Sequence, residues 1–166
     1  MQNTNNVLVD VQDLKVQFLL HEGTVHALEG VSFQIEQGKT LGVIGESGSG
    51  KSVTAQAIMG IIPSPPGKVV DGRVLLNLPE NDASVRVVNV TELPPSGSEI
   101  RSIRGKEVSM IFQEPMTSFS PVHTLGNQIM EAIRIHYPDV SKREARERSI
   151  EMMRRVGIPR PEERID

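Results

Sequence analysis

The chain has 166 residues, of which 37% are hydrophobic and 23% are charged, and these values are ordinary for a globular domain with its own core. A formal net charge of −3 gives no general attraction to nucleic acid or to anionic lipid. The sequence has no cysteine, which excludes disulfides and cysteine-ligated metal sites. No apolar run approaches the ~20 residues of a membrane span, and the N-terminus lacks a secretory-signal pattern. A role at a membrane would therefore require docking on another protein.

Alternating valines and other apolar residues at the start of the chain predict strands over residues 7–11 and 14–18. A further strand is expected over residues 25–28 and 31–35, interrupted at Gly30. Turn residues separate these segments, so the opening is predicted to be an antiparallel β-meander.

A glycine-rich segment follows the meander. Leu41, Val43 and Ile44 are predicted to end a buried strand, and Gly45–Ser52 fits the pattern G-x-x-x-x-G-K-[ST] of a phosphate-binding loop. A helix is expected from about Lys51, and its apolar members are Val53, Ala55, Ile58, Met59 and Ile62. Strand, glycine loop and helix in this order are the context that the motif needs.

The residue types in this loop suit a triphosphate. Gly45, Gly48 and Gly50 carry no side chain, so successive backbone N–H groups can curl around the phosphates. The helix N-terminus adds N–H donors and the positive end of a dipole. Lys51 can reach the β- and γ-phosphates, and the Ser52 hydroxyl suits Mg²⁺, which prefers oxygen ligands.

Two strands and a loop are expected next. Residues 69–77 and 85–90 are predicted to form a hairpin, and their connection over residues 78–84 is predicted to be a surface loop. A short helix is expected over residues 99–104. An apolar strand over residues 107–112 would then deliver Gln113 at its C-terminal end, on the same side as the phosphate-binding loop.

Two helices are predicted in the last third of the chain. Thr124 can cap the first, over residues 124–136, and a capping box of Ser141 and Glu144 begins the second, over residues 141–156. The four histidines have no second ligand at the spacing of a metal site, so none is expected to bind metal.

Together, Gly45–Ser52 and the run Ser109–Ser118 (Ser-Met-Ile-Phe-Gln-Glu-Pro-Met-Thr-Ser) resemble the nucleotide-binding subunit of ATP-binding-cassette (ABC) transporters. Within that family they resemble the branch that powers import of dipeptides, oligopeptides and nickel. The resemblance extends from Leu8 to about Pro159. It implies an α/β fold: a P-loop NTPase core of ABC type with an N-terminal antiparallel β-meander and the start of an α-helical subdomain, truncated.

The resemblance also implies roles for individual residues. Gly45–Ser52 would be the Walker A loop and Gln113 the Q-loop glutamine, so Lys51 and Gln113 would be catalytic and Ser52 and Gln113 would hold Mg²⁺. Phe18 matches the aromatic residue that stacks on adenine. The residues expected to bind ATP are Phe18, Gly45, Glu46, Ser47, Gly48, Ser49, Gly50, Lys51, Ser52 and Val53.

By the same resemblance, residues 1–123 would form the nucleotide-binding core and residues 124–166 the beginning of the helical subdomain. Residues 114–123 would help to form the groove that receives a coupling helix of a membrane-spanning permease subunit. The other expected partner is a second ABC ATPase subunit, identical or paralogous. The implied location is the cytoplasmic face of the inner membrane, as a peripheral protein with no inserted segment and no nucleic-acid partner.

Several motifs of the family are not found in the sequence: the Leu-Ser-Gly-Gly-Gln signature, the Walker B strand with its catalytic Glu, and the switch His. The chain is therefore expected to be the N-terminal portion of such a subunit, able to bind ATP–Mg²⁺ only weakly and unable to hydrolyse it alone. The missing Walker B strand would lie beside the phosphate-loop strand, so its absence would leave an open sheet edge.

Two other functions remain open at this stage. The first is a non-catalytic nucleotide-binding module that is complete at this length, which predicts cooperative unfolding of a monodisperse monomer. The second is an ABC ATPase that works on nucleic acid, which predicts salt-dependent DNA binding, although the sequence has neither zinc-binding cysteines nor an excess of basic residues.

Overall fold

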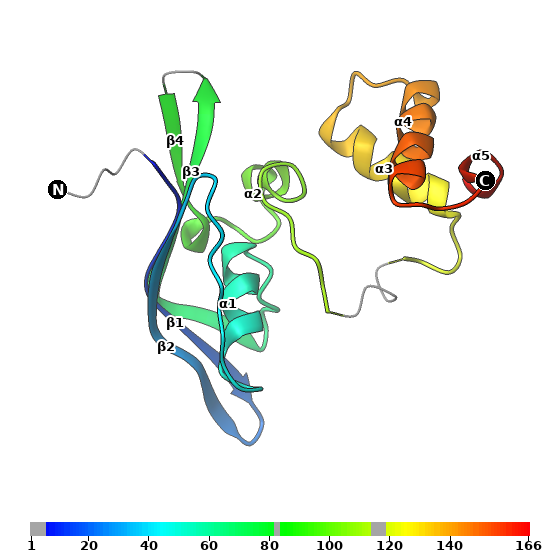
Figure 1. The fold of residues 1–166 in the computed structure, drawn as a ribbon. Helices are drawn as coiled ribbons and strands as arrows, with labels where there is room; N and C mark the ends of the chain where they lie inside the picture. Colours follow the sequence, from blue (N-terminus) through cyan, green and yellow to red (C-terminus); the bar gives the residue numbers. More distant parts are fainter. Residues whose placement is uncertain (1–5, 82–83, 114–118) are drawn as a thin grey trace. The chain divides into compact units, whose positions relative to one another are not determined.

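The N-terminal part of the chain is built on an antiparallel sheet. The computed structural model describes residues 6–81, 84–113 and 119–166, and it divides into two units, Met1–Val108 and Ser109–Asp166 (Figure 1). We call them the N-terminal and C-terminal units. The sheet of the N-terminal unit has the strand order β2-β1-β3-β4. Its strands are β1 (Val7–Leu20), β2 (Gly23–Glu36), β3 (Gly67–Asn81) and β4 (Ser84–Asn89).

The predicted meander is present, but its strands are longer than the sequence pattern indicated. β1 runs unbroken through a register shift between Val11 and Leu14, because Asp13 takes a positive φ of 45° that absorbs an irregularity there. The prediction of a surface loop over residues 78–84 is wrong for the first residues of that range. β3 continues to Asn81 because Leu78 is buried and extends the inward-facing series of Val74 and Leu76.

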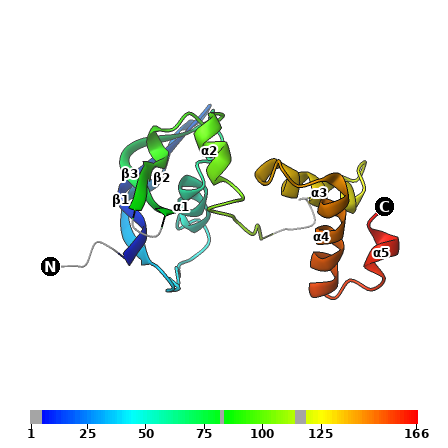
Figure 2. The same ribbon diagram turned by 90° about the horizontal axis from the view of Figure 1, so that it is seen from above.

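One face of the sheet is covered by helices. α1 (Lys51–Ile58), the 3₁₀ turn η2 (Val90–Glu92) and α2 (Ser98–Ile103) lie on the same side of it (Figures 1 and 2). The core between these layers consists of apolar side chains, namely Val11, Leu14, Val16, Leu28, Ala57, Val74, Leu76, Leu78, Val88, Val90, Ile100 and Ile103. The predicted short helix over residues 99–104 thus corresponds to α2.

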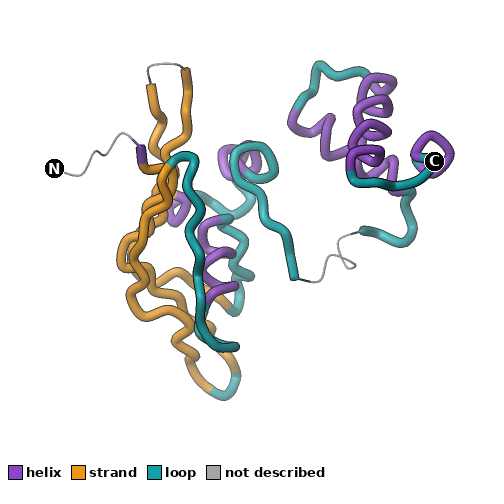
Figure 3. Tube along the Cα trace, in the orientation of Figure 1, coloured by secondary structure: helices purple, strands orange, loops and turns teal. Residues whose placement is uncertain are grey.

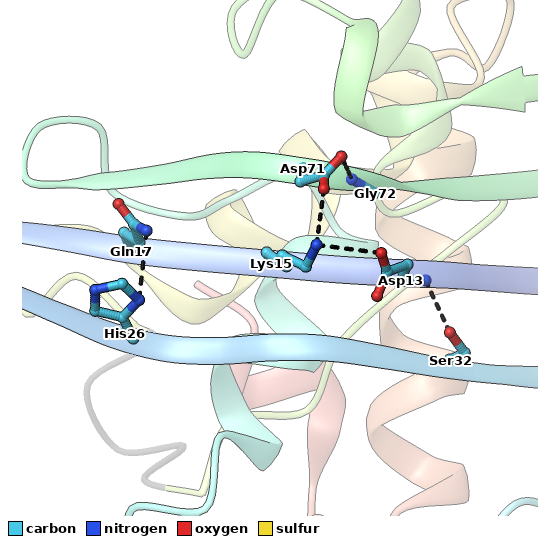
Figure 4. Close-up of polar contacts among 7 residues, drawn as sticks. All are labelled: Asp13, Lys15, Gln17, His26, Ser32, Asp71 and Gly72. Carbon is cyan, nitrogen blue, oxygen red and sulfur yellow. Dashed lines mark hydrogen bonds and ion pairs between the residues drawn. The ribbon is translucent and has the colours of Figure 1, made fainter.

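The opposite face of the sheet carries a polar cluster (Figure 4). On the central strand β1, Lys15 Nζ lies 2.8 Å from Asp71 Oδ2 on β3 and 3.2 Å from Asp13 Oδ2. The backbone N–H of Gly72 donates to Asp71 Oδ1 at 2.9 Å. The hydrogen bond from Lys15 is the main cause that lowers the pKa of the Asp71 carboxyl, and Asp71 in turn raises the pKa of Lys15.

The two apolar strands predicted at residues 41–44 and 107–112 do not form. The first lies in the loop that connects β2 with α1 (Figure 3), and Ile44 is 99% exposed. In the second, an isolated bridge between Arg104 and Val108 is followed by irregular chain, and Ile111 is 94% exposed. A β-strand exists only through hydrogen bonds to a neighbour, and within the described ranges no strand pairs with either segment.

The C-terminal unit consists of α3 (Leu125–His136), α4 (Lys142–Arg155) and α5 (Pro161–Arg164). Both predicted helix starts are confirmed, because Thr124 Oγ1 accepts from Asn127 N and Ser141 Oγ accepts from Glu144 N. The helices pack around Met130, Ala145, Ser149, Met153 and Ile165. Across both units, none of the described helices is long and apolar enough to cross a membrane.

Candidate functional site

The glycines of the loop before α1 have distinct structural roles. Gly48 and Gly50 have positive φ angles of 83° and 89°. A Cβ on Gly50 would lie 2.5 Å from Leu28 Cδ2 and 2.9 Å from the Ala27 carbonyl oxygen of β2. Position 50 therefore requires glycine both for its backbone conformation and for the close approach of the loop to the sheet.

Lys51, the first residue of α1, folds back over the loop. Its Nζ donates to the carbonyl oxygens of Gly45 at 2.7 Å and Glu46 at 2.6 Å, and to Ser49 Oγ at 3.2 Å. A Cβ on Gly45 would lie 2.6 Å from Ser49 Oγ, so the absence of a side chain there lets the loop close. The ammonium thus sits inside the curl of Gly45–Lys51, directly before the helix N-terminus.

The remaining predicted residues of the loop differ in exposure. Glu46, Ser47, Ser49 and Ser52 are exposed, which leaves their polar groups accessible. Val53 is half-buried and packs against the hydrophobic core, so its side chain anchors α1 to the sheet. Ser52 follows Lys51 in the first turn of α1, so its hydroxyl is carried on the same turn as the ammonium.

Phe18 lies near the end of β1, paired in register with Val25 of β2 and Gly67 of β3. Its ring is half-buried and packs against the core, and a Cβ on Gly67 would lie 2.9 Å from Phe18 Cε1. Phe18 is in the same half of the sheet as the strand segment Ala27–Leu28 that supports Gly50.

Gln113 is exposed and belongs to the C-terminal unit. Residues 114–118, which begin the predicted groove for a coupling helix, lie outside the described residues. In the part that follows, the Gln128 side chain organises the loop before α3. Its amide nitrogen donates to the carbonyl oxygens of Ser120 at 3.1 Å and His123 at 3.0 Å, and its Oε1 accepts from Ser120 N at 2.8 Å.

The ABC transporter family matches residues 28–166, which include the loop, Lys51 and Gln113. The chain belongs to the ABC transporter family. Two curated relatives from Bacillus subtilis are an oligopeptide transport ATP-binding protein, OppD, 43% identical over 96% of this chain, and a dipeptide transport ATP-binding protein, DppD, 44% identical over 95% of it.

The chain spans less than half of these relatives, 41% of the OppD length and 44% of the DppD length. Among solved structures, a dimeric ABC transporter cassette named MJ0796 is similar in fold, with a TM-score of 0.70 and 22% sequence identity. That likeness covers 89% of this chain and 56% of the cassette. The ABC-type α/β fold expected from the sequence is therefore confirmed.

In this ABC transporter chain, the residues that hold the loop in place were not predicted from the sequence. Thr54 is buried, and its Oγ1 and N both donate to the Gly50 carbonyl oxygen at 2.9 Å, which fixes the loop to the first turn of α1. A threonine four residues after a glycine is a pattern that could have indicated this bond. Ala27 and Leu28, which approach Gly50 from β2, gave no such signal.

No group of three or more His, Cys, Asp or Glu side chains that could hold a metal ion is found among residues 6–81, 84–113 and 119–166. The Mg²⁺ site expected from the sequence does not depend on such a group, because it involves a hydroxyl, an amide and phosphate oxygens.

Proposed function

We propose that this chain is the ATP-binding part of an ATPase subunit that drives an ABC importer of dipeptides, oligopeptides or a related solute. The observation that carries the proposal is the Lys51 ammonium, held by the carbonyls of Gly45 and Glu46 inside a glycine loop at the start of a helix. A concave loop with a central cation and a helix N-terminus fits a triphosphate chain. The names of the relatives, which include ATP binding and peptide transport, agree with it.

Each residue of the loop would do part of the binding. Lys51 has its ammonium pre-positioned, and its longest contact, the 3.2 Å one to Ser49 Oγ, is the one that a phosphate oxygen would most easily replace. The first N–H groups of α1 would donate to the β-phosphate. Mg²⁺, held by Ser52 and Gln113, would neutralise charge that develops on the γ-phosphate. Phe18 would stack on adenine.

The proposal extends to the whole subunit. Hydrolysis would require a signature motif, a Walker B strand and a catalytic Glu, which this sequence does not contain. The proposed partners are membrane-spanning permease subunits and a second ATPase subunit, at the cytoplasmic face of the inner membrane. We propose residues 1–123 as nucleotide-binding core and 124–166 as the start of the helical subdomain. The structural units divide at Val108, so residues 109–123 are assigned to the core on the family resemblance alone.

Exposed apolar segments favour the proposal of a partial ATPase subunit over the alternative of a nucleotide-binding module that is complete at this length. A finished core would be expected to bury Val43, Ile44 and Ile111, which are all exposed here. In a longer subunit, these segments would gain strands beside them and become the parallel part of the sheet.

Calorimetric titration of the chain with MgATP tests the binding proposal. We expect measurable binding by the unaltered chain and a loss of at least tenfold in affinity in Lys51→Ala, since one charge-assisted contact to phosphate is worth about 1.5–3 kcal/mol. Lys39→Ala, which removes an exposed cation before the loop, is the matched control and should bind normally. Equal affinity for MgATP in both variants would contradict the proposal that Lys51 binds the phosphates. Steady ATP hydrolysis by the unaltered chain would contradict the proposal that it is only part of an ATPase subunit.

A further inference from the structure

Arg104 binds the far end of the helix that begins with Lys51. It follows α2, and its guanidinium spreads over three backbone carbonyls. Nε donates to the Met59 carbonyl oxygen at 2.9 Å, Nη1 to that of Pro95 at 3.0 Å, and Nη2 to that of Gly60. Two of these carbonyls directly follow the last residue of α1, so one side chain fills the role of a helix C-cap.

The surroundings of this guanidinium are shaped to hold it. Gly60 has a positive φ of 63°, and a Cβ there would lie 3.2 Å from Arg104 Nη2 and 3.3 Å from Ile100 Cδ1. A cation at the C-terminal end of a helix is also favoured by the helix dipole. Because Arg presents a rigid fork of donors, it fixes the end of α1 both in position and in direction.

The Arg104 backbone leads into the segment that ends at Gln113. Gly105 N donates to the Val108 carbonyl oxygen at 2.8 Å, and Arg104 and Val108 form a parallel bridge. Gln113 follows nine residues after Arg104 in the sequence. Arg104 therefore holds the helix that begins with Lys51 and starts the chain segment that carries Gln113, the proposed Q-loop glutamine.

We propose that Arg104 is a positioning residue for nucleotide binding, acting through α1 on Lys51 and Ser52. This inference rests on the proposed function. α1 has eight residues and is about 12 Å long, so a shift or tilt at its C-terminal end is transmitted to its N-terminal end. Phosphate binding depends on that N-terminal end to within a fraction of an ångström.

The chain offers a matched control in Arg101. It lies on α2, three residues earlier, and its Nη2 donates to a single carbonyl oxygen, that of Ser96, at 2.7 Å. It is the same residue type in the same helix region, and none of its hydrogen bonds to the residues that the structure describes reaches α1. A general effect of losing an arginine from this region would appear equally in both variants.

The test compares Arg104→Gln, Arg104→Lys and Arg101→Gln in the full 166-residue chain, at a temperature where circular dichroism shows each to be folded. MgATP and AMP affinities are measured by displacement of a fluorescent ATP analogue. We expect MgATP affinity to fall about tenfold in Arg104→Gln, on the scale of one lost charge-assisted phosphate contact, and less in Arg104→Lys, with AMP affinity unchanged. Amide hydrogen exchange over residues 54–60 should accelerate in both Arg104 variants, with Arg101→Gln like the unaltered chain.

A MgATP affinity within twofold of the unaltered chain in Arg104→Gln would overturn the inference. So would an equal loss for MgATP and AMP, since that indicates a general structural effect. If Arg104→Gln does not fold, the Arg104→Lys variant is judged by the same ratio of MgATP to AMP affinity. Failure of the unaltered chain to bind MgATP would instead overturn the proposed function, and the inference with it.

Discussion

The sheet of the N-terminal unit and the loop segment at residues 41–44 contain the same kinds of side chain in opposite surroundings. Leu14 and Val16 on β1 are 0% exposed, whereas Ile44 is 99% exposed. β1 pairs with β2 on one side and β3 on the other, and its inner face is covered by α1 and α2. Residues 41–44 have an apolar pattern but are paired with no strand described in the structure.

The difference shows that an apolar pattern indicates that a segment can be buried in a strand. Whether the segment is buried and paired depends on the other segments that pack beside it. Burial of an apolar side chain requires atoms on every side, and strand formation requires a neighbouring backbone. The two ends of the glycine loop Gly45–Ser52 differ in the same way. Its Gly50 end rests on Leu28 of the covered sheet, and its Gly45 end follows the exposed Ile44.

The largest difference in stability is expected between the variants Leu14→Ala and Ile44→Ala. Leu14→Ala leaves a cavity in a closed core, so we expect a loss of about 2–5 kcal/mol in the free energy of unfolding. Ile44→Ala removes a solvated side chain and should change that energy by less than about 0.5 kcal/mol. Urea denaturation followed by circular dichroism measures both values. A loss above about 1 kcal/mol in Ile44→Ala would mean that residues 41–44 are buried in solution.

The next effect distinguishes two glycines of the loop, one in close contact with β2 and one with open space around it. Gly50→Ala combines a positive φ with a Cβ 2.5 Å from Leu28 Cδ2, and we expect it to cost about 2–4 kcal/mol of stability. Gly48→Ala has a similar φ, but no atom lies within 4 Å of its Cβ, so the cost should be about 1–2 kcal/mol. Thermal unfolding of the two variants measures the difference. Equal destabilisation would show that contact with β2 contributes nothing to the loop.

Local patterns in the sequence predicted what depends on local interactions. The helix caps at Thr124 and Ser141 and the glycine loop before Lys51 are set by neighbours within a few residues. The pairing of β1 with β3 was not predicted, because it joins residues about sixty positions apart and no turn specifies it. The prediction of a buried strand at residues 41–44 was wrong for a related reason, because strand pairing depends on other segments of the chain. The support of α1 by Arg104 was missed because a single polar residue gives no periodic signal. The bond from Thr54 to the Gly50 carbonyl was missed although the spacing of the two residues could have indicated it.

A smaller effect is expected in the C-terminal unit, where the relevant contacts lie within single helices. Ser141→Ala removes the hydroxyl that accepts from Glu144 N at 3.2 Å, and we expect a loss of about 1 kcal/mol in the free energy of unfolding. Lys142→Ala, one residue later and exposed, is the control and should cost less than about 0.5 kcal/mol. Both are measured by urea denaturation. Similar values for the two variants would mean that the cap contributes nothing in solution.

The smallest effect concerns the exposed face of the sheet, where Lys15 and Asp71 lie 37% and 61% exposed (Figure 4). The lowered pKa of Asp71 means that its contribution to stability is present above its usual value of 3.8 and is lost as the pH falls through the folded pKa. The raised pKa of Lys15 has the opposite sense, so its contribution is present below 10.5 and is lost as the pH rises through the folded value.

Asp71→Asn should therefore lower the melting temperature slightly near neutral pH. The difference from the unaltered chain should shrink as the pH falls below 3.8 and through the lowered pKa of the folded Asp71 carboxyl, where that carboxyl becomes protonated. High salt should reduce the difference, because both groups are in contact with solvent. Glu107→Gln, which removes a looser ion pair with Lys106 at 3.9 Å, is the control and should leave the melting temperature unchanged. If the difference between Asp71→Asn and the unaltered chain stayed constant from neutral pH to pH 3, the carboxylate charge would not be its source. The hydrogen bond from Gly72 N would not be the source either, because an amide oxygen can still accept it.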